Sequence, residues 1–253
     1  MFQLDLAPAD PILGLTETFK ADTHPDKINL GVGVYQDATG KTPILKAVTQ
    51  AETHLLKNES SKGYLSIPGV PELATHTQEL LFGAGHAIIQ EGRAKTAQTP
   101  GGTGALRVAA DFLLRAAPKA TVWLSNPSWA NHQAIFEAAG FPVKDYRYYD
   151  KASQGFDSEG FMADLEGVAE GDIVILHGCC HNPSGIDLDQ TAWEAIATQA
   201  KAKNLICLVD FAYQGFGEGL EEDRAGLHVL LDAGLTVLIA SSFSKNFGLY
   251  SER

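Results

Sequence analysis

The sequence has few cysteines, a minority of basic residues and no long apolar run. Its three cysteines, Cys179, Cys180 and Cys207, form no disulfide framework. Lys and Arg number 19 against 31 Asp and Glu, which gives a formal net charge of −12. This imbalance argues against a nucleic-acid or anionic membrane surface as partner, although it allows a local cationic pocket for a small anion. No run approaches the roughly 18 apolar residues that cross a bilayer.

The N-terminal stretch MFQLDLAPADPILG has acidic residues and prolines where a secretory signal peptide has a basic start and an apolar core. We therefore expect a cytoplasmic protein with no membrane contact. The remaining composition is ordinary for a globular protein, with 45% hydrophobic and 20% charged residues. A chain of 253 residues can bury a substantial core.

Short apolar runs alternate with helical patterns through the middle of the chain, which is typical of parallel strands joined by helical crossovers. Strands are predicted at 121–125, 172–177, 205–211 and 235–240. Helices are predicted at 43–57, 71–82, 103–116, 131–139, 190–203 and 224–232. We predict an α/β fold in which residues 1–40 form an arm and part of a small domain, and residues 41–253 form the large domain.

Open parallel sheets bind ligands at the carboxyl ends of their strands, so the polar residues beyond each apolar run are the candidates for function. The stretch GGTGALR, residues 101–107, puts three glycines and a threonine at the start of a helix. Backbone N–H groups and the helix dipole favour an anion there. The letters match neither a Walker loop nor a dinucleotide fingerprint. A phosphate site and a plain glycine turn are both open at this point.

Asp210 ends the apolar run LICLVD, where a carboxylate is costly unless it is paired. It is a metal ligand, the partner of a protonated nitrogen, or a cap for the next helix. Tyr213, three residues later, can reach the same cleft.

Lys245 follows the apolar run LTVLIA within SSFSKNFGLYSER. A lysine at such a place either extends to solvent or is used for its chemistry. Nucleophilic lysines form Schiff bases with carbonyl substrates and with pyridoxal phosphate. Ser242, Ser244 and Arg253 are phosphate-binding residue types in the same stretch, and they favour the chemical interpretation.

The stretch HGCCH, residues 177–181, offers a competing hypothesis. Alternate residues of a strand share a face, so His177, Cys179 and His181 could form a metal site. A fourth ligand is not evident, and buried free cysteines beside structural histidines are commoner. We predict no metal.

Five stretches together resemble one known family. TPGGTGALR, NPSWANH, HGCCHNPSG, DFAYQGF and SFSKNFGLY occur in the order and spacing of the aspartate and aromatic aminotransferases, fold-type I enzymes that depend on pyridoxal phosphate (PLP). The likeness runs from APADPILGL near the start to the final arginine. It implies a mostly parallel sheet flanked by helices in three layers. It also implies transfer of an amino group from an L-amino acid, aspartate and/or aromatic, to a 2-oxo acid such as 2-oxoglutarate.

The resemblance also implies roles for single residues. Lys245 would carry PLP as an internal aldimine and then move the proton between the substrate α-carbon and the cofactor. Asp210 would pair with the pyridine nitrogen, which makes the ring an electron sink, and His132 would support Asp210. Tyr213 and Asn182 would hydrogen-bond the cofactor's 3′-oxygen.

Further implied positions surround the cofactor and the substrate. Trp129 would pack on the cofactor ring and, with Asn182 and Gly33, contact the substrate. The implied phosphate-binding residues are Gly102, Thr103, Ser242 and Arg253. Tyr64 would reach the phosphate from the other subunit, which implies a homodimer with shared active sites.

The chain departs from the family at its end, because family members continue past the position of Arg253 into the arginine that grips the substrate α-carboxylate. We therefore expect a truncated chain without its C-terminal small domain. Two alternatives stay open: a non-catalytic fragment that dimerises and still binds PLP, and another PLP reaction such as β-decarboxylation or lyase chemistry.

Overall fold

The computed structural model describes residues 15, 18–28 and 33–252. The chain divides into two compact units, Met1–Ile44 and Leu45–Arg253. In the described part of the first unit, Asp37 Oδ1 accepts hydrogen bonds from the backbone N–H groups of Thr39 at 2.8 Å and Lys41 at 3.1 Å, which closes a turn.

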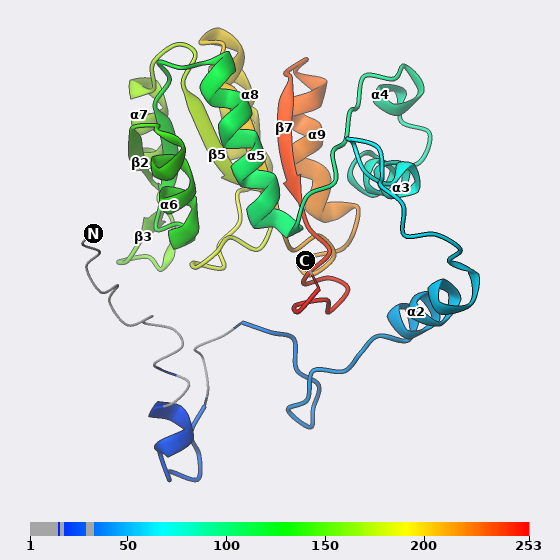
Figure 1. The fold of residues 1–253 in the computed structure, drawn as a ribbon. Coiled ribbons are helices and arrows are strands. Elements are labelled where there is room, and N and C mark those ends of the chain that lie inside the picture. Colours follow the sequence, from blue (N-terminus) through cyan, green and yellow to red (C-terminus); the bar gives the residue numbers. More distant parts are fainter. Residues whose placement is uncertain (1–14, 16–17, 29–32, 253) are drawn as a thin grey trace, which may run out of the picture. The chain divides into compact units, whose positions relative to one another are not determined.

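The second unit is built on a five-stranded parallel sheet in the order β2-β1-β5-β6-β7 (Figure 1). The strands are β1 (Val122–Asn126), β2 (Val143–Arg147), β5 (Ile173–His177), β6 (Ile206–Phe211) and β7 (Val237–Ser241). A separate antiparallel pair joins β3 (Tyr149–Asp150) to β4 (Gly155–Phe156). The strand order reverses between β1 and β5, so ligands are expected at that crevice and along the carboxyl ends beside it.

Some helices precede the first strand, and others connect the strands because parallel neighbours need long crossovers. They are α2 (Lys46–Asn58), α3 (Pro71–Phe82), α4 (Ala87–Gln90), α5 (Gly101–Ala116), α6 (Ala130–Ala139), α7 (Ser158–Gly167), α8 (Gln190–Ala202) and α9 (Ala225–Asp232), the last preceded by a 3₁₀ turn, η1 (Glu222–Arg224). The helix expected from residue 43 begins at Lys46, since Leu45 has an extended backbone. Helix α3 has the predicted bounds.

The sheet buries apolar side chains on both faces. In β5, Ile173 and Ile175 pack with α5 and α6, whereas Val174 and Leu176 pack with α7, α8 and α9. This alternation gives three layers, with the sheet between two helix layers (Figure 1). Burial of each large side chain on either face stabilises the fold by about 1.5–3 kcal/mol. The predicted α/β fold class is confirmed.

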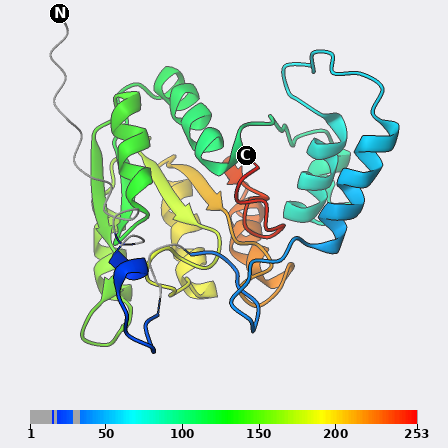
Figure 2. The same cartoon turned by 60° about the horizontal axis from the view of Figure 1, so that its bottom comes forward.

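The strand register brings three residues level at one edge of the sheet. His177 in β5 lies opposite Asp210 in β6, which lies opposite Ala240 in β7. Residues 242–252 leave β7 at this edge, which Figure 2 turns toward the reader. The sequence candidate Asp210 therefore lies near the carboxyl end of β6, and Lys245 follows the neighbouring strand β7.

Candidate functional site

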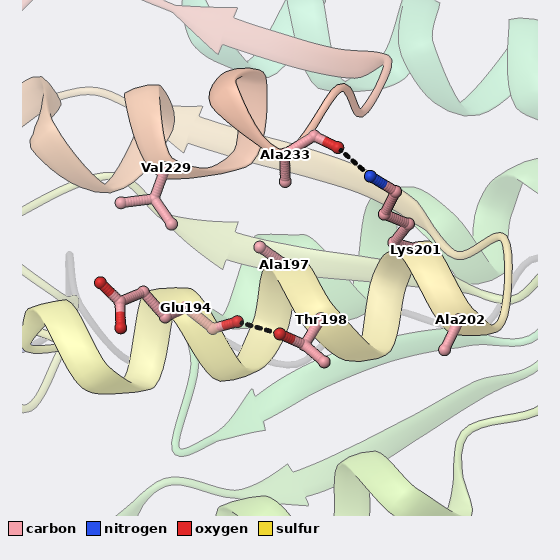
Figure 3. Close-up of a pocket in the computed structure, with 7 residues that line it drawn as sticks. All are labelled: Glu194, Ala197, Thr198, Lys201, Ala202, Val229 and Ala233. Carbon is pink, nitrogen blue, oxygen red and sulfur yellow. Dashed lines mark hydrogen bonds between the residues drawn. The ribbon is translucent and has the colours of Figure 1, made fainter.

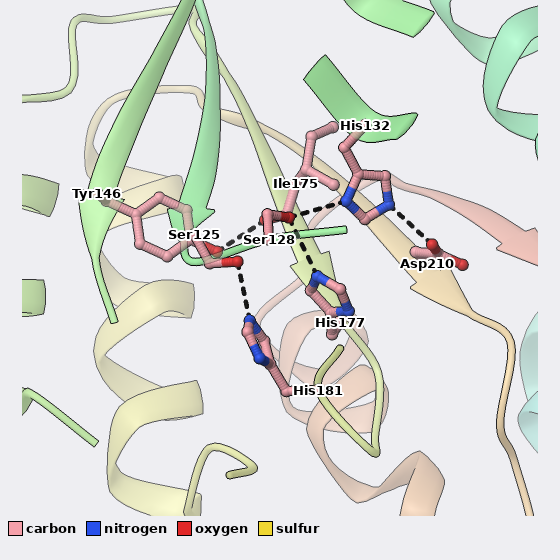
Figure 4. Close-up of polar contacts among 8 residues, drawn as sticks. All are labelled: Ser125, Ser128, His132, Tyr146, Ile175, His177, His181 and Asp210. Carbon is pink, nitrogen blue, oxygen red and sulfur yellow. Dashed lines mark hydrogen bonds and ion pairs between the residues drawn. The ribbon is translucent and has the colours of Figure 1, made fainter. Parts of the chain in front are cut away.

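A buried carboxylate–imidazole pair is the centre of the site (Figure 4). His132 Nε2, on α6, lies 2.8 Å from Asp210 Oδ2, on β6. The side chain of His132 is fully buried and that of Asp210 is 11% exposed. The hydrogen bond compensates for the burial of the Asp210 charge, which would otherwise be costly at this depth.

A serine connects this pair to a second histidine. Ser128 Oγ lies 2.9 Å from His132 Nδ1 and 3.4 Å from His177 Nε2. An ionised Asp210 can only accept, so His132 Nε2 carries the hydrogen of their bond. A neutral His132 then accepts from the Ser128 hydroxyl, whose oxygen accepts from His177 Nε2. Burial above all, and then the nearby His181, His132 and Lys245, lower the pKa of His177 to about 2.

His181 belongs to a neighbouring cluster. Its Nε2 lies 2.8 Å from Ser125 Oγ (Figure 4). Its Nδ1 lies 2.7 Å from Ser184 Oγ, and its ring stacks on that of Tyr148 with the centroids 3.8 Å apart. Burial, and then the nearby His132, lower its pKa to about 4. Each ring nitrogen of His181 thus has a serine hydroxyl as its hydrogen-bond partner.

The premise of the metal hypothesis is wrong, because β5 ends at His177 and Cys180 has a φ of 49°. Residues 177, 179 and 181 therefore do not share one face of a strand. No group of three or more His, Cys, Asp or Glu that could hold a metal ion occurs among the residues described.

Lys245 lies four residues beyond the end of β7, and its Nζ stands 4.1 Å from the centroid of the Tyr213 ring. Such a contact between an amine and an aromatic face is favourable for the charged amine. Within the described part of the chain, Lys245 has no carboxylate ion-pair partner. The amine is therefore held at the strand edge without being neutralised by an acid.

The N-terminus of α5 lies against the segment that follows β7. Pro100 caps this helix without a side-chain hydrogen bond, so its first amides have no side-chain acceptor at the cap. A Cβ added to Gly102 would stand 3.4 Å from Ser242 Cβ, so Gly102 and Ser242 are neighbours. The N-terminal amides of α5, the helix dipole and the Ser242 hydroxyl together favour an anion of phosphate type.

Other predicted positions lie at the same edge with less specific contacts. Trp129 precedes α6, and its ring meets that of His132 edge-on at 5.3 Å. Asn182 is half-buried in the loop after β5, and Thr103 is exposed in the first turn of α5.

For three other predicted positions the structure describes no contact at this site. Gly33 lies in the first unit and is exposed. Tyr64 lies between α2 and α3 with its side chain fully exposed. Arg253 lies outside the described residues.

Two residues of the hydrogen-bond chain were not predicted as site residues. Ser128 and His177 stand inside the stretches NPSWANH and HGCCHNPSG, but Ser128 was given no role and His177 was considered only as a metal ligand. Their signal was positional, since His177 is the last residue of β5 and pairs in register with Asp210.

An open groove of about 520 Å³ lies elsewhere, between α8 and α9 (Figure 3). Lys201 crosses it to donate a hydrogen bond to the Ala233 carbonyl at 3.0 Å. Its other lining residues are Glu194, Ala197, Thr198, Ala202 and Val229. These side chains offer neither a base with a partner nor an anion site, so the strand edge is the better candidate.

A family model described as "Aminotransferase class I and II" matches residues 25–253. The chain belongs to this family. Within the aminotransferases it is 55% identical to the aspartate aminotransferase of Salmonella typhi, over 100% of this chain and 64% of that relative. It is 46% identical to the aromatic-amino-acid aminotransferase of Pseudomonas aeruginosa, over 97% of this chain and 61% of the relative. The chain thus spans less than two thirds of their length.

Solved aminotransferase structures agree with the fold. The aromatic-amino-acid aminotransferase from Burkholderia pseudomallei, covalently bound to pyridoxal phosphate, matches with a TM-score of 0.96 at 49% identity, over 99% of this chain and 63% of that one. The aspartate aminotransferase from Saccharomyces cerevisiae cytoplasm matches with a TM-score of 0.92 at 36% identity, over 99% of this chain and 62% of that one. In the described part of the chain, every helix is too short or too polar to cross a membrane.

Proposed function

We propose that this chain forms the PLP-binding part of an aminotransferase that acts on L-aspartate, aromatic L-amino acids, or both. The observation that carries the proposal is the meeting of three features at one strand edge. These are the Lys245 amine, the Asp210–His132 pair and the open N-terminus of α5 beside Ser242. PLP carries an aldehyde, a pyridine nitrogen and a phosphate. The aldehyde needs an amine, the nitrogen needs a carboxylate and the phosphate needs an anion site.

The donor set fits PLP. The first amides of α5 and the Ser242 hydroxyl would hold the phosphate, with Thr103 and Arg253 proposed beside them. Oδ1 of Asp210, the oxygen not bonded to His132, would accept from the pyridine nitrogen. Trp129 would cover the ring, and Tyr213 and Asn182 would bond the 3′-oxygen. When bound, PLP supplies an electron sink for charge that develops on the substrate α-carbon.

The chain's own residues supply the proton transfers and the alignment. Lys245 Nζ would bind the cofactor aldehyde and, as a free amine, would accept the proton of the substrate α-carbon. The Tyr213 ring keeps Nζ at this place. His132 keeps Asp210 oriented through the 2.8 Å bond, and Ser128 orients His132. Gly33 is proposed to lie in the segment that closes over the substrate and excludes water.

We also propose that the active unit is a homodimer in which Tyr64 reaches the partner's phosphate site. Tyr64 is fully exposed, as expected for a side chain with its contact on another subunit. On the outer face of α5, Val108 and Phe112 are 51% and 58% exposed and stand one helical turn apart. Exposed apolar side chains next to a site are typical of subunit interfaces.

The proposal is tested by the half-reaction. The chain loaded with PLP is mixed with L-aspartate or L-tyrosine, and conversion to pyridoxamine phosphate is followed by absorbance. We expect conversion by the wild type, none by Lys245→Ala, and a loss of about 10²-fold or more in Asp210→Ala, because that carboxylate acts on developing charge. Lys144→Ala is the control, since Lys144 also stands over an aromatic ring, 5.2 Å from Trp123.

Conversion by Lys245→Ala at the wild-type rate would contradict the proposal. Product analysis with aspartate addresses the alternative reactions, because oxaloacetate is the transamination product whereas alanine is the product of β-decarboxylation. The names of the relatives favour transamination.

A further inference from the structure

The loop after β6 is held by a buried carboxylate that the function described above does not use. Residues 214–223 follow Tyr213 directly and include Gly215, Gly217 and Gly219. Such a glycine-rich loop has many accessible conformations, and each ordered residue costs about 1–2 kcal/mol of backbone entropy. The loop needs a specific restraint if the residue at its start is to keep one position.

Asp223 supplies that restraint. Its Oδ2 accepts from the N–H groups of Gly215 at 2.8 Å and Gly217 at 3.1 Å, and its Oδ1 accepts from Glu218 at 2.8 Å and Gly219 at 3.3 Å. The side chain is only 7% exposed. Burial alone would raise its pKa, but the four backbone N–H groups together lower the pKa below its ordinary value.

The fit of the loop around this carboxylate is tight. A Cβ on Gly217 would stand 2.5 Å from Asp223 Oδ1, so only glycine lets the backbone approach this closely. The neighbouring Gln214, 2% exposed, donates from its amide nitrogen to the carbonyls of Leu80 and Leu220, both at 2.9 Å. The turn also closes on Tyr213 itself, whose carbonyl accepts from Phe216 N–H at 3.0 Å.

We propose that Asp223 is a positioning residue that orders loop 214–223 and thereby holds the Tyr213 ring against the Lys245 amine. Its consequence for cofactor chemistry rests on the function proposed above, whereas the contact between Tyr213 and Lys245 does not. Loss of the four hydrogen bonds frees the backbone that begins one residue after Tyr213. The ring then leaves its place 4.1 Å from Nζ.

The first measurement uses the cofactor-free chain. The Tyr213 ring face should shift the NMR resonance of the Lys245 ε-methylene group upfield, and Tyr213→Leu, which removes the ring, gives the unshifted reference. We expect Asp223→Asn to lose most of this upfield shift. Gly217→Ala, which displaces the carboxylate but keeps its charge, should do the same and serves if Asp223→Asn does not fold.

Asp172→Asn is the matched control. Asp172 is 6% exposed and accepts from Thr121 N–H, Trp123 Nε1–H and Ala169 N–H, but it lies at the opposite end of β5. Loss of the Asp172 carboxylate should lower the melting temperature of the protein without moving the Lys245 resonance. A wild-type Lys245 resonance in folded Asp223→Asn or Gly217→Ala would overturn the inference, as would an equal loss of the shift in Asp172→Asn.

A second measurement connects the inference to the cofactor. With PLP bound, the absorbance of the adduct is titrated with pH in the wild type, Asp223→Asn and Asp172→Asn. A phenol that hydrogen-bonds the 3′-oxygen stabilises the deprotonated adduct, so loss of its position should raise the apparent pKa of the adduct by about one unit, the worth of one such bond. An unchanged titration alongside a lost Lys245 shift would contradict the proposed role of Tyr213 and leave the positioning by Asp223 intact.

Discussion

Two histidines beside the site are kept neutral by burial, and this gives the protein a defined pH dependence. The pKa of His177 is lowered to about 2 and that of His181 to about 4. The unfolded chain binds a proton on each histidine below about pH 6.5, whereas the folded chain binds none until the lower values. Unfolding therefore takes up protons between pH 6.5 and 4, and the free energy of unfolding falls as the pH falls.

The pH dependence is measured by urea unfolding at pH 7.5 and 5.5. Each neutral histidine contributes a loss of up to about 1.4 kcal/mol per pH unit below its unfolded pKa. We expect the wild type to lose stability between the two pH values and His181→Gln to lose less, while His76→Gln, at an exposed position, behaves as the wild type. Equal losses in His181→Gln and the wild type would show that the His181 pKa is not lowered.

At the scale of single residues, the sequence predicted the carboxylate and the lysine but not the chain of hydrogen bonds behind them. A charged residue is unusual at the end of a buried strand, so the residue types of Asp210 and Lys245 alone indicate a functional site. Ser128 and His177 are common residues whose importance depends on distances of 2.9 Å and 3.4 Å. Those distances are set by the crossing of α6 over the sheet, which residue types do not specify.

At the scale of elements, the turn from β5 into its loop has no room for a side chain at Gly178. A Cβ there would stand 1.7 Å from Phe211 Cδ2, and Gly178 N–H also donates to the Asp210 carbonyl at 2.9 Å. Phe211 is buried and cannot move away without opening the core.

We therefore expect Gly178→Ala to destabilise the protein by about 1–3 kcal/mol through overpacking. Gly167→Ala is the control, because a Cβ at this end of α7 meets no atom within 4 Å. It should change stability by less than about 1 kcal/mol, in the stabilising direction. Chemical denaturation of both variants gives the comparison. Equal stability of Gly178→Ala and the wild type would mean that the contact between Gly178 and Phe211 is looser than described.

Prediction of the elements succeeded where the local apolar pattern was clear and failed where it was weak. Strand β5 and helix α3 have strong patterns and were predicted to within a residue. Strand β2 was missed because it is an edge strand, VKDYR, in which only Tyr146 is buried. Helix α7 was missed as well, although it buries Phe161 and Leu165. Both elements depend on tertiary packing more than on local pattern.

At the scale of the whole molecule, the exposed side chains of α5 predict self-association. Phe112→Lys puts a charge into the proposed interface and should weaken dimerisation at least about tenfold, a free-energy cost of about 1.4 kcal/mol. Thr198→Lys adds the same charge in the groove between α8 and α9 and should leave association unchanged. Sedimentation analysis of the three proteins measures this. A Phe112→Lys dimer as stable as that of the wild type would place the interface elsewhere.

The family and the fold class could be predicted from the sequence, because five stretches in fixed order reflect one arrangement of strand ends, and both predictions are confirmed. The predicted domain boundary after residue 40 and the boundary after Ile44 differ by four residues. The roles of the site residues, the dimer and the cytoplasmic location stay predictions.

The most direct test of the central claim is to reduce the chain with borohydride after incubation with PLP and to map the pyridoxyl group by peptide mass analysis. Lys245 is set apart from the other lysines by its place over Tyr213 at the strand edge that carries Asp210 and Ser242. The account predicts a single pyridoxyl group on Lys245. Labels scattered over surface lysines, or an unlabelled Lys245, would contradict it.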